Sequence, residues 1–147
     1  MKILLAIDDS TFSQAATEAV VAQASPKETE VKVLHVIEPL PLYPEGQAWG
    51  YKSLPAPVSE EEPKEAEELV VRSAQTLRDA GFAVTTAVER GIPKVVIIDS
   101  AKEWPADLVV VGSHGRKGLN RFLMGSVSEA VARHAPCSVQ IVRVPTQ

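Results

Sequence analysis

The sequence predicts one α/β domain built on an open, doubly wound sheet of five parallel strands with helices on both faces. Short apolar runs rich in Val, Ile and Leu, typical of strands buried on both faces, alternate with segments of helical periodicity. The 147 residues suffice for a single sizeable core. A glycine-rich loop that joins one of these runs to a helix predicts a ligand site at the edge of such a sheet.

The composition argues against several classes of protein. A net charge of −4 is not that of a protein that binds nucleic acid or an anionic membrane. No apolar run approaches the roughly 18 residues of a membrane-spanning helix, and the run after Lys2 is too short for a signal peptide. The single cysteine, Cys137, fits a reducing compartment. We therefore expect a cytoplasmic protein in which Cys137 is a buried small side chain rather than a nucleophile.

The first strand, residues 2–7, is nearly continuous in Ile, Leu and Ala, as a central strand buried on both faces would be. It ends at Asp8, and ligands of open α/β sheets bind beyond the carboxyl ends of the strands. A helix follows to about residue 24. Because either Asp9 or Ser10 can cap that helix, Asp8 is a candidate ligand-binding residue.

The second strand, residues 30–37, contains His35, for which we expect a structural role. The next segment, residues 38–58, has no clean period and holds five of the eleven prolines. A loop of this length is either a functional lid or disordered, and the sequence leaves both open.

The middle of the chain predicts two further helices around a third strand. Ser59 and Glu62 have the spacing of a capping box before a long amphipathic helix that Gly81 ends. The third strand, residues 82–88, is partly polar and so belongs nearer an edge of the sheet. The third helix starts at Pro93.

A glycine-rich loop follows the fourth strand, residues 108–111. Gly112, Gly115 and Gly125 precede a helix start at Ser126. Glycines let the backbone approach a ligand closely, and the N–H groups and dipole of a helix N-terminus favour phosphate oxygens. The loop is also locally basic, since it contains Arg116, Lys117 and Arg121 and no acid.

A second interpretation of the same loop needs no ligand. Ser126 and Glu129 have the spacing of a capping box, which would start the helix by itself. The loop lacks both the Walker pattern and the G-x-G-x-x-G pattern of dinucleotide-binding proteins. The last strand, residues 138–144, follows after Pro136 has ended the helix.

The spacing G-x2-G-x9-G-S after an apolar strand resembles the ATP-binding signature of the universal stress protein family. The opening MKILLAIDDS and the closing HAPCSVQIVR also resemble that family, except that Ser138 stands where the family often has a second proline. The resemblance implies an adenine-nucleotide alpha-hydrolase-like fold with strand order 3-2-1-4-5. It also implies a bound ATP, or another adenine nucleotide, with Mg²⁺ or Mn²⁺ at its phosphates.

The same resemblance implies a site. Backbone atoms of Val36 would meet the adenine, Asp8 and Gly112 would lie near the ribose, and the loop with the helix start would hold the phosphates. The residues expected to bind the nucleotide are Ala6, Ile7, Asp8, Val36, Val111, Gly112, His114, Gly115, Arg116, Gly125, Ser126, Val127 and Ser128.

The last strand also predicts a homodimer. Residues 138–144 would form a sheet edge that is apolar and carries only one charge, Arg143. Many family members dimerise through this strand. The alternative is that residues 38–58 cover the edge.

Three functions suit these features. The first is an ATP-binding sensor or protector in a stress response, as the resemblance implies. The second is a slow ATPase or a nucleotidyl-transfer enzyme, for which Asp8 and His114 are the only candidate bases near the loop. The third is a flavodoxin-like redox protein that binds FMN.

Overall fold

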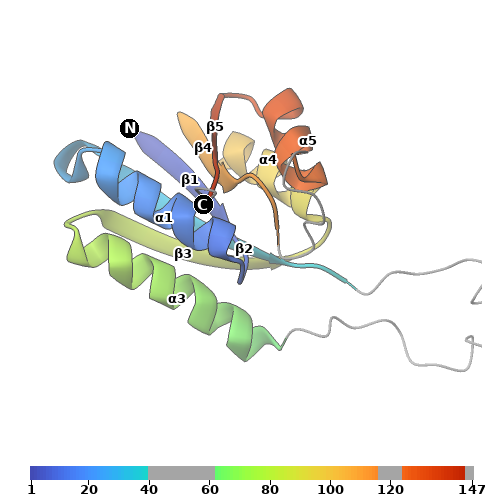
Figure 1. The fold of residues 1–147 in the computed structure, drawn as a ribbon, viewed down its shortest axis with the longest axis horizontal. Coiled ribbons are helices and arrows are strands. Elements are labelled where there is room, and N and C mark those ends of the chain that lie inside the picture. Colours follow the sequence, from blue (N-terminus) through green and yellow to red (C-terminus); the bar gives the residue numbers. More distant parts are fainter. Residues whose placement is uncertain (40–61, 116–123, 145–147) are drawn as a thin grey trace, which may run out of the picture.

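The computed structural model describes residues 1–39, 62–115 and 124–144. These residues form a five-stranded parallel sheet of order β3-β2-β1-β4-β5, with helices on both faces (Figure 1). The elements are β1 (Lys2–Ile7), α1 (Thr11–Gln23), the short 3-10 helix η1 (Pro26–Glu28), β2 (Glu30–Ile37), α3 (Pro63–Asp79), β3 (Ala83–Arg90), α4 (Pro93–Glu103), β4 (Leu108–Gly112), α5 (Ser126–His134) and β5 (Ser138–Val142). The predicted fold class and strand order are confirmed.

Strand β1 lies at the centre of the sheet. The chain adds β2 and β3 on one side of it and later adds β4 and β5 on the other. One side of β1 pairs with β2, with Ile7 opposite His35, and the other side pairs with β4, with Leu5 opposite Val110. The chain leaves the carboxyl end of β1 towards α1 on one face and that of β4 towards α5 on the other. The strand order therefore reverses between these two strands, which is where open α/β sheets bind ligands.

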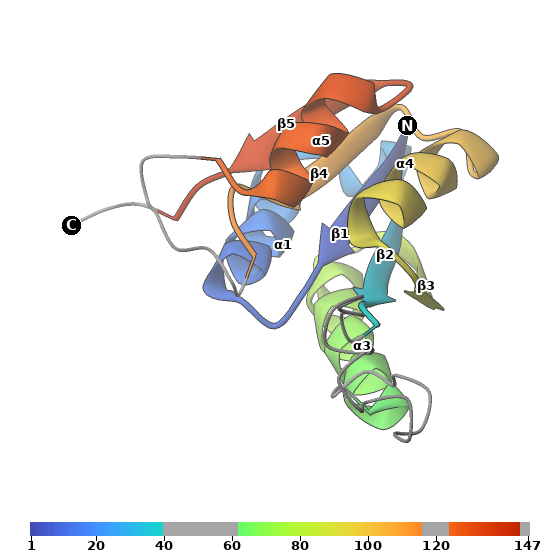
Figure 2. The same ribbon diagram turned by 90° about the vertical axis from the view of Figure 1, so that its right-hand side faces the viewer.

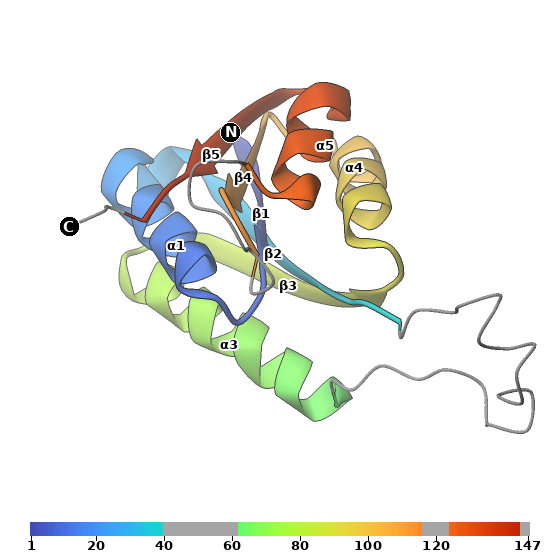
Figure 3. The same ribbon diagram turned by 45° about the vertical axis from the view of Figure 1, so that its right-hand side comes forward.

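The core has two layers, one on each face of the sheet (Figures 2 and 3). Helices α1 and α3 cover one face and α4 and α5 the other. Alternate residues of β1 point to opposite layers: Ile3, Leu5 and Ile7 pack on the α1 and α3 side, whereas Leu4 and Ala6 pack on the α4 and α5 side. This double burial explains why the sequence of β1 shows no polar alternation.

The predicted bounds of β1 and β2 match the structure, and Gly81 ends α3 with φ +97°. The capping box at residues 59–62 was wrong. Helix α3 begins at Pro63, and its N-cap residue Glu62 makes no capping hydrogen bond through its side chain. Proline lacks an N–H and has a helical φ, so it occupies the first helical position without a capping partner. Ser59 and most of the loop predicted at residues 38–58 lie outside the described residues.

The two edge strands are β3 and β5. β3 is only half-buried, as its polar residues predicted. β5 ends at Val142 rather than at Val144. Among the described residues, no helix is long and apolar enough to cross a membrane.

Candidate functional site

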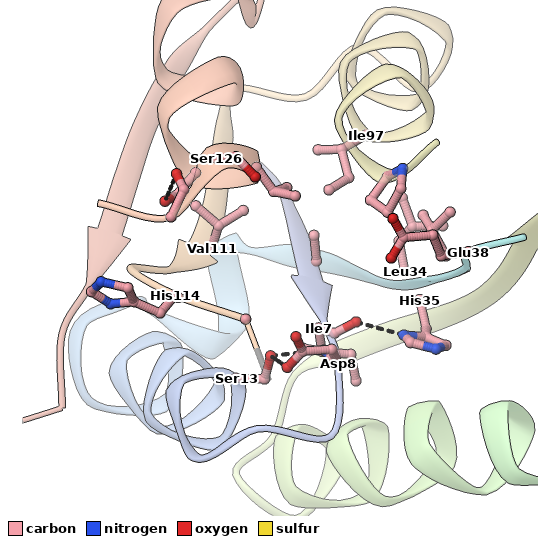
Figure 4. A pocket seen from close by; sticks show the side chains of 18 residues that line it. Ile7, Asp8, Ser13, Leu34, His35, Glu38, Ile97, Val111, His114 and Ser126 are labelled. Atoms are coloured by element: carbon pink, nitrogen blue, oxygen red, sulfur yellow. Dashed lines mark hydrogen bonds between the residues drawn. The ribbon is translucent and has the colours of Figure 1, made fainter. Parts of the chain in front are cut away.

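A cavity of about 250 Å³ opens at the carboxyl ends of β1, β2 and β4, where the strand order reverses (Figure 4). The beginnings of α4 and α5 close it from one side, with Ile97 and Ser126 facing it. Asp8 and Ser13 lie on the opposite side, after β1 and in the first turn of α1. The cavity is thus part apolar and part polar, as small-molecule sites are.

Every expected site residue that the structure describes lines this one cavity. They are Ala6, Ile7, Asp8, Val36, Val111, Gly112, His114, Gly115, Gly125, Ser126, Val127 and Ser128. Arg116, together with the basic residues Lys117 and Arg121, lies outside the described residues.

The sequence did not indicate six further lining residues: Ser13, Leu34, His35, Glu38, Pro93 and Ile97. Leu34 could have been found, because it shares a face of β2 with Val36. Pro93 and Ile97 could not, because only the packing of α4 beside the sheet brings them to the cavity. Ser13 carries no motif of its own in the sequence, and the first turn of α1 brings it to the cavity.

The glycines of the loop make room for other parts of the protein. A Cβ atom at Gly112 would lie 2.7 Å from the Cβ atom of Phe12 and 3.0 Å from its backbone carbonyl. One at Gly115 would lie 2.9 Å from Oδ2 of Asp8. One at Gly125 would lie 3.2 Å from the Ser113 carbonyl oxygen. The loop therefore packs closely on α1 and on Asp8 because these positions lack side chains.

The start of α5 differs from the predicted capping box. Its N-cap residue is Gly125, so Ser126 is the first helical residue and caps nothing. The N–H of Gly125 donates to the Ser113 carbonyl (2.8 Å), which holds the helix start against the loop. The N-cap therefore lies one residue earlier than the capping-box pattern predicted. The start of α5 therefore has no side-chain cap, and the exposed Ser126 lies at the cavity.

Ser128 braces this junction. Its buried hydroxyl donates to the carbonyl oxygens of Ser113 (2.9 Å) and Gly125 (3.0 Å). A hydroxyl has one proton, so these two carbonyls share it, and the Ser128 N–H is the group left to the phosphate role that the resemblance implies. Ser128 therefore lines the cavity, while its hydroxyl proton stabilises the junction of the loop with α5.

Two histidines line the cavity in different settings. His35 is buried, and its Nδ1 lies 2.7 Å from the carbonyl oxygen of Ile7 in the neighbouring strand, as expected of a structural side chain (Figure 4). His114 follows β4, with its Nδ1 3.0 Å from the Ser113 hydroxyl and its ring 5.0 Å from that of Phe12. Both rings are therefore held by neighbouring groups.

Cys137 is half-buried just before β5, away from the cavity, and packs against the α4 and α5 layer. Burial raises the pKa of its thiol, and the nearby Asp107 carboxylate raises it further, against a smaller lowering by a hydrogen bond with the backbone of Val109. The thiol form is favoured, as expected of a side chain that is not a nucleophile, but Cys137 is half-buried rather than buried as predicted.

The described residues offer few side-chain ligands for a metal ion. In the part of the chain that the structure describes, no three His, Cys, Asp or Glu side chains gather closely enough to hold one. The cavity lining includes two carboxylates, Asp8 and Glu38.

Comparisons with known proteins agree with this architecture. A sequence model of the universal stress protein family matches residues 1–143. A universal stress protein of Synechocystis sp. is 35% identical over 149 residues, which cover 97% of this chain and 97% of that protein. The structure is similar to that of the universal stress protein UspA from Lactobacillus plantarum, with a TM-score of 0.79, 28% identity and 97% of each chain covered.

A universal stress protein family protein from Arabidopsis thaliana, whose structure has AMP bound, shares the fold. Its TM-score is 0.72 at 20% identity, with 99% of this chain and 93% of that chain covered. The family match spans nearly the whole chain, and the Synechocystis relative covers 97% of it at 35% identity. The chain therefore belongs to the universal stress protein family.

Proposed function

We propose that this protein binds ATP, or another adenine nucleotide, in the cavity at the ends of β1, β2 and β4, and acts as a nucleotide-dependent sensor or protector in a stress response. One observation carries the proposal: the start of α5, which has no side-chain cap, opens onto a cavity that has apolar walls at its other end. A phosphate chain suits the start of α5, and a purine base suits the apolar walls. The AMP bound to the Arabidopsis protein supports the same ligand class.

The lining divides into parts that match the parts of a nucleotide. Leu34, Val36 and Ile97 are buried apolar residues on β2 and α4, and they would pack against the base. Asp8 would face the ribose. The backbone from Gly125 to Ser128, with the Ser126 hydroxyl, would donate to the phosphates, where the helix dipole adds favourable charge.

A divalent ion would fit this arrangement only as a companion of the nucleotide. Mg²⁺ in nucleotide sites commonly takes one or two carboxylates and completes its shell with phosphate oxygens and water. Among the described residues, Asp8 and Glu38 are the carboxylates that line the cavity. Mg²⁺ or Mn²⁺ would neutralise phosphate charge there, and the protein's own part would be to orient the nucleotide.

Titration calorimetry with ATP tests the proposal. We expect one site per chain with a dissociation constant on the order of micromolar, which corresponds to about −8 kcal/mol. ATP should bind more tightly than GTP. An absence of heat with ATP, ADP and AMP alike would refute the proposal.

The same samples separate binding from catalysis. Phosphoryl transfer needs a positioned base and stabilising cations, and the candidate bases here, Asp8 and His114, are both engaged by neighbouring groups. Release of phosphate at several turnovers per second would favour the ATPase. A flavin absorbance in the purified protein would favour the redox alternative.

We also propose that the protein is a homodimer paired through the edge strand β5. The carbonyl of Val142 accepts from Ser113 in the loop after β4, so Val142 turns its backbone groups towards β4. Ile141, one residue earlier, therefore turns its N–H and C=O outwards. An outward row of such groups on an apolar edge is a template for a second copy.

Replacing Ile141 with proline should dissociate this dimer and leave the sheet intact, because proline removes an outward N–H only. Sedimentation equilibrium should show a dimer for the wild type and a monomer for Ile141→Pro. The matched control is Val142→Pro, which removes an N–H that faces β4 and should lower the thermal unfolding midpoint. A wild type that is monomeric at micromolar concentration would overturn the proposal. An undiminished dimer in Ile141→Pro would place the interface elsewhere.

A further inference from the structure

Ser13 and Asp8 form a reciprocal pair of hydrogen bonds at the wall of the cavity (Figure 4). The N–H of Asp8 donates to Oγ of Ser13 (2.7 Å), and that hydroxyl donates to Oδ1 of Asp8 (2.9 Å). Ser13 is only 6% exposed, so water competes little for this pair. The hydroxyl thus binds both the backbone and the carboxylate of the same residue.

Ser10 completes the arrangement. Its N–H donates to Oδ1 of Asp8 (2.9 Å), and its hydroxyl caps α1 by accepting from the N–H of Ser13 (3.3 Å). Oδ1 of Asp8 therefore accepts two hydrogen bonds from the start of α1. Two donors on one oxygen fix the plane of a carboxylate as well as its direction.

The second oxygen of Asp8 points to the glycine loop. A Cβ atom at Gly115 would come within 2.9 Å of Oδ2, so Oδ2 lies directly over that glycine. Asp8 and Gly115 both line the cavity. The start of α1 thus holds Oδ1 of this carboxylate, and Oδ2 lies beside the loop.

We infer that Ser13 is a positioning residue, which orients the Asp8 carboxylate so that Oδ2 faces the nucleotide. This inference rests on the proposed function and adds a residue on which its affinity depends. Ser10 holds the same oxygen through a backbone N–H, which any residue could supply. Of these two donors to Oδ1, the Ser13 hydroxyl belongs to a side chain, so a substitution can remove it.

Ser13→Ala should weaken ATP binding about tenfold, the ratio expected for the loss of one hydrogen bond to a charged group. The matched control is Thr17→Val. Thr17 lies one turn further along α1 and is 5% exposed, and its hydroxyl bonds to the Ser13 carbonyl (3.1 Å) and to Ser73 (3.0 Å) rather than to Asp8. It should lose some thermal stability and keep the ATP affinity.

Two further variants separate positioning from general destabilisation. Ser13→Thr keeps the hydroxyl and should restore most of the affinity. In an Asp8→Ala background, Ser13→Ala should cost no further affinity, because the group that it positions has gone. Additive losses in that background, or equal ATP affinity of Ser13→Ala and wild type, would refute the inference.

A measurement without nucleotide keeps this test apart from that of the proposed function. Side-chain coupling constants from NMR of the ligand-free protein should show one rotamer of Asp8 in the wild type and in Thr17→Val. They should show averaging in Ser13→Ala. A single Asp8 rotamer in Ser13→Ala would overturn the inference whether or not ATP binds. A wild type that binds no nucleotide would overturn the proposed function and its nucleotide, and the rotamers would still decide whether Ser13 orients Asp8.

Discussion

Ser126→Glu is expected to weaken ATP binding by about a hundredfold or more without loss of stability. Ser126 is the exposed first residue of α5 and lines the cavity. A carboxylate there stabilises the helix by about 0.3–1 kcal/mol through its interaction with the helix dipole. Against a phosphate it repels: two unit charges about 4 Å apart cost about 4 kcal/mol at an effective dielectric constant of about 20. Each 1.4 kcal/mol or so is a factor of ten in affinity.

Thr11→Glu is the matched control for this experiment. Thr11 is the exposed first residue of α1, and it does not line the cavity. The control introduces the same charge at the same helical position, so both variants should unfold at or slightly above the wild-type temperature. Calorimetric titration should show the loss of ATP affinity in Ser126→Glu alone. Equal affinity in the two variants would exclude the start of α5 as the phosphate site.

Gly112→Ala is expected to destabilise the fold by about 2–3 kcal/mol, the upper part of the range of about 1–3 kcal/mol for overpacking a dense site. The new methyl group would lie 2.7 Å from Cβ and 3.0 Å from the backbone carbonyl of Phe12, so the start of α1 would have to move. For a chain of this size, the unfolding midpoint should fall on the order of 5–10 °C.

Gly115→Ala gives the contrasting result. Its methyl group would meet only a side-chain oxygen, Oδ2 of Asp8 at 2.9 Å, and the backbone of Gly115 does not have a positive φ. We expect it to keep most of the thermal stability and to lose ATP affinity as Asp8 is displaced. An unchanged melting temperature in Gly112→Ala would show that α1 adjusts more easily than the close contact with Phe12 indicates.

The sequence predicted the strands well because burial on both faces leaves a strong apolar signal. β1 and β2 have the predicted bounds, and the half-polar pattern of β3 correctly indicated an edge. Hydrophobic periodicity does not predict the order of the strands in the sheet. It came from the resemblance to a family, through the glycine spacing and the two chain ends.

Both predicted capping boxes failed for a common reason. The pattern compares two residues three positions apart, and it takes no account of what the neighbouring backbone binds. At α5, the hydrogen bond from Gly125 to Ser113 sets the start of the helix, and at α3 the conformation of Pro63 does so. The contribution of α4 to the cavity was missed similarly, because Ile97 reaches it only through the packing of layers.

The central position of β1 has a consequence for how the chain is made. On one side, β1 pairs with β2, which is the next strand in the chain. On the other side its partners come much later, since the N–H of Lys2 donates to Asp107, 105 residues further on. A growing chain can therefore assemble β1, β2 and β3 while the other side of β1 stays open. That side is a row of apolar residues with unpaired backbone groups, the kind of surface that aggregates or recruits chaperones. The strand that carries Asp8 to the cavity is thus synthesised well before β4, its partner on that side, and is among the last to be enclosed.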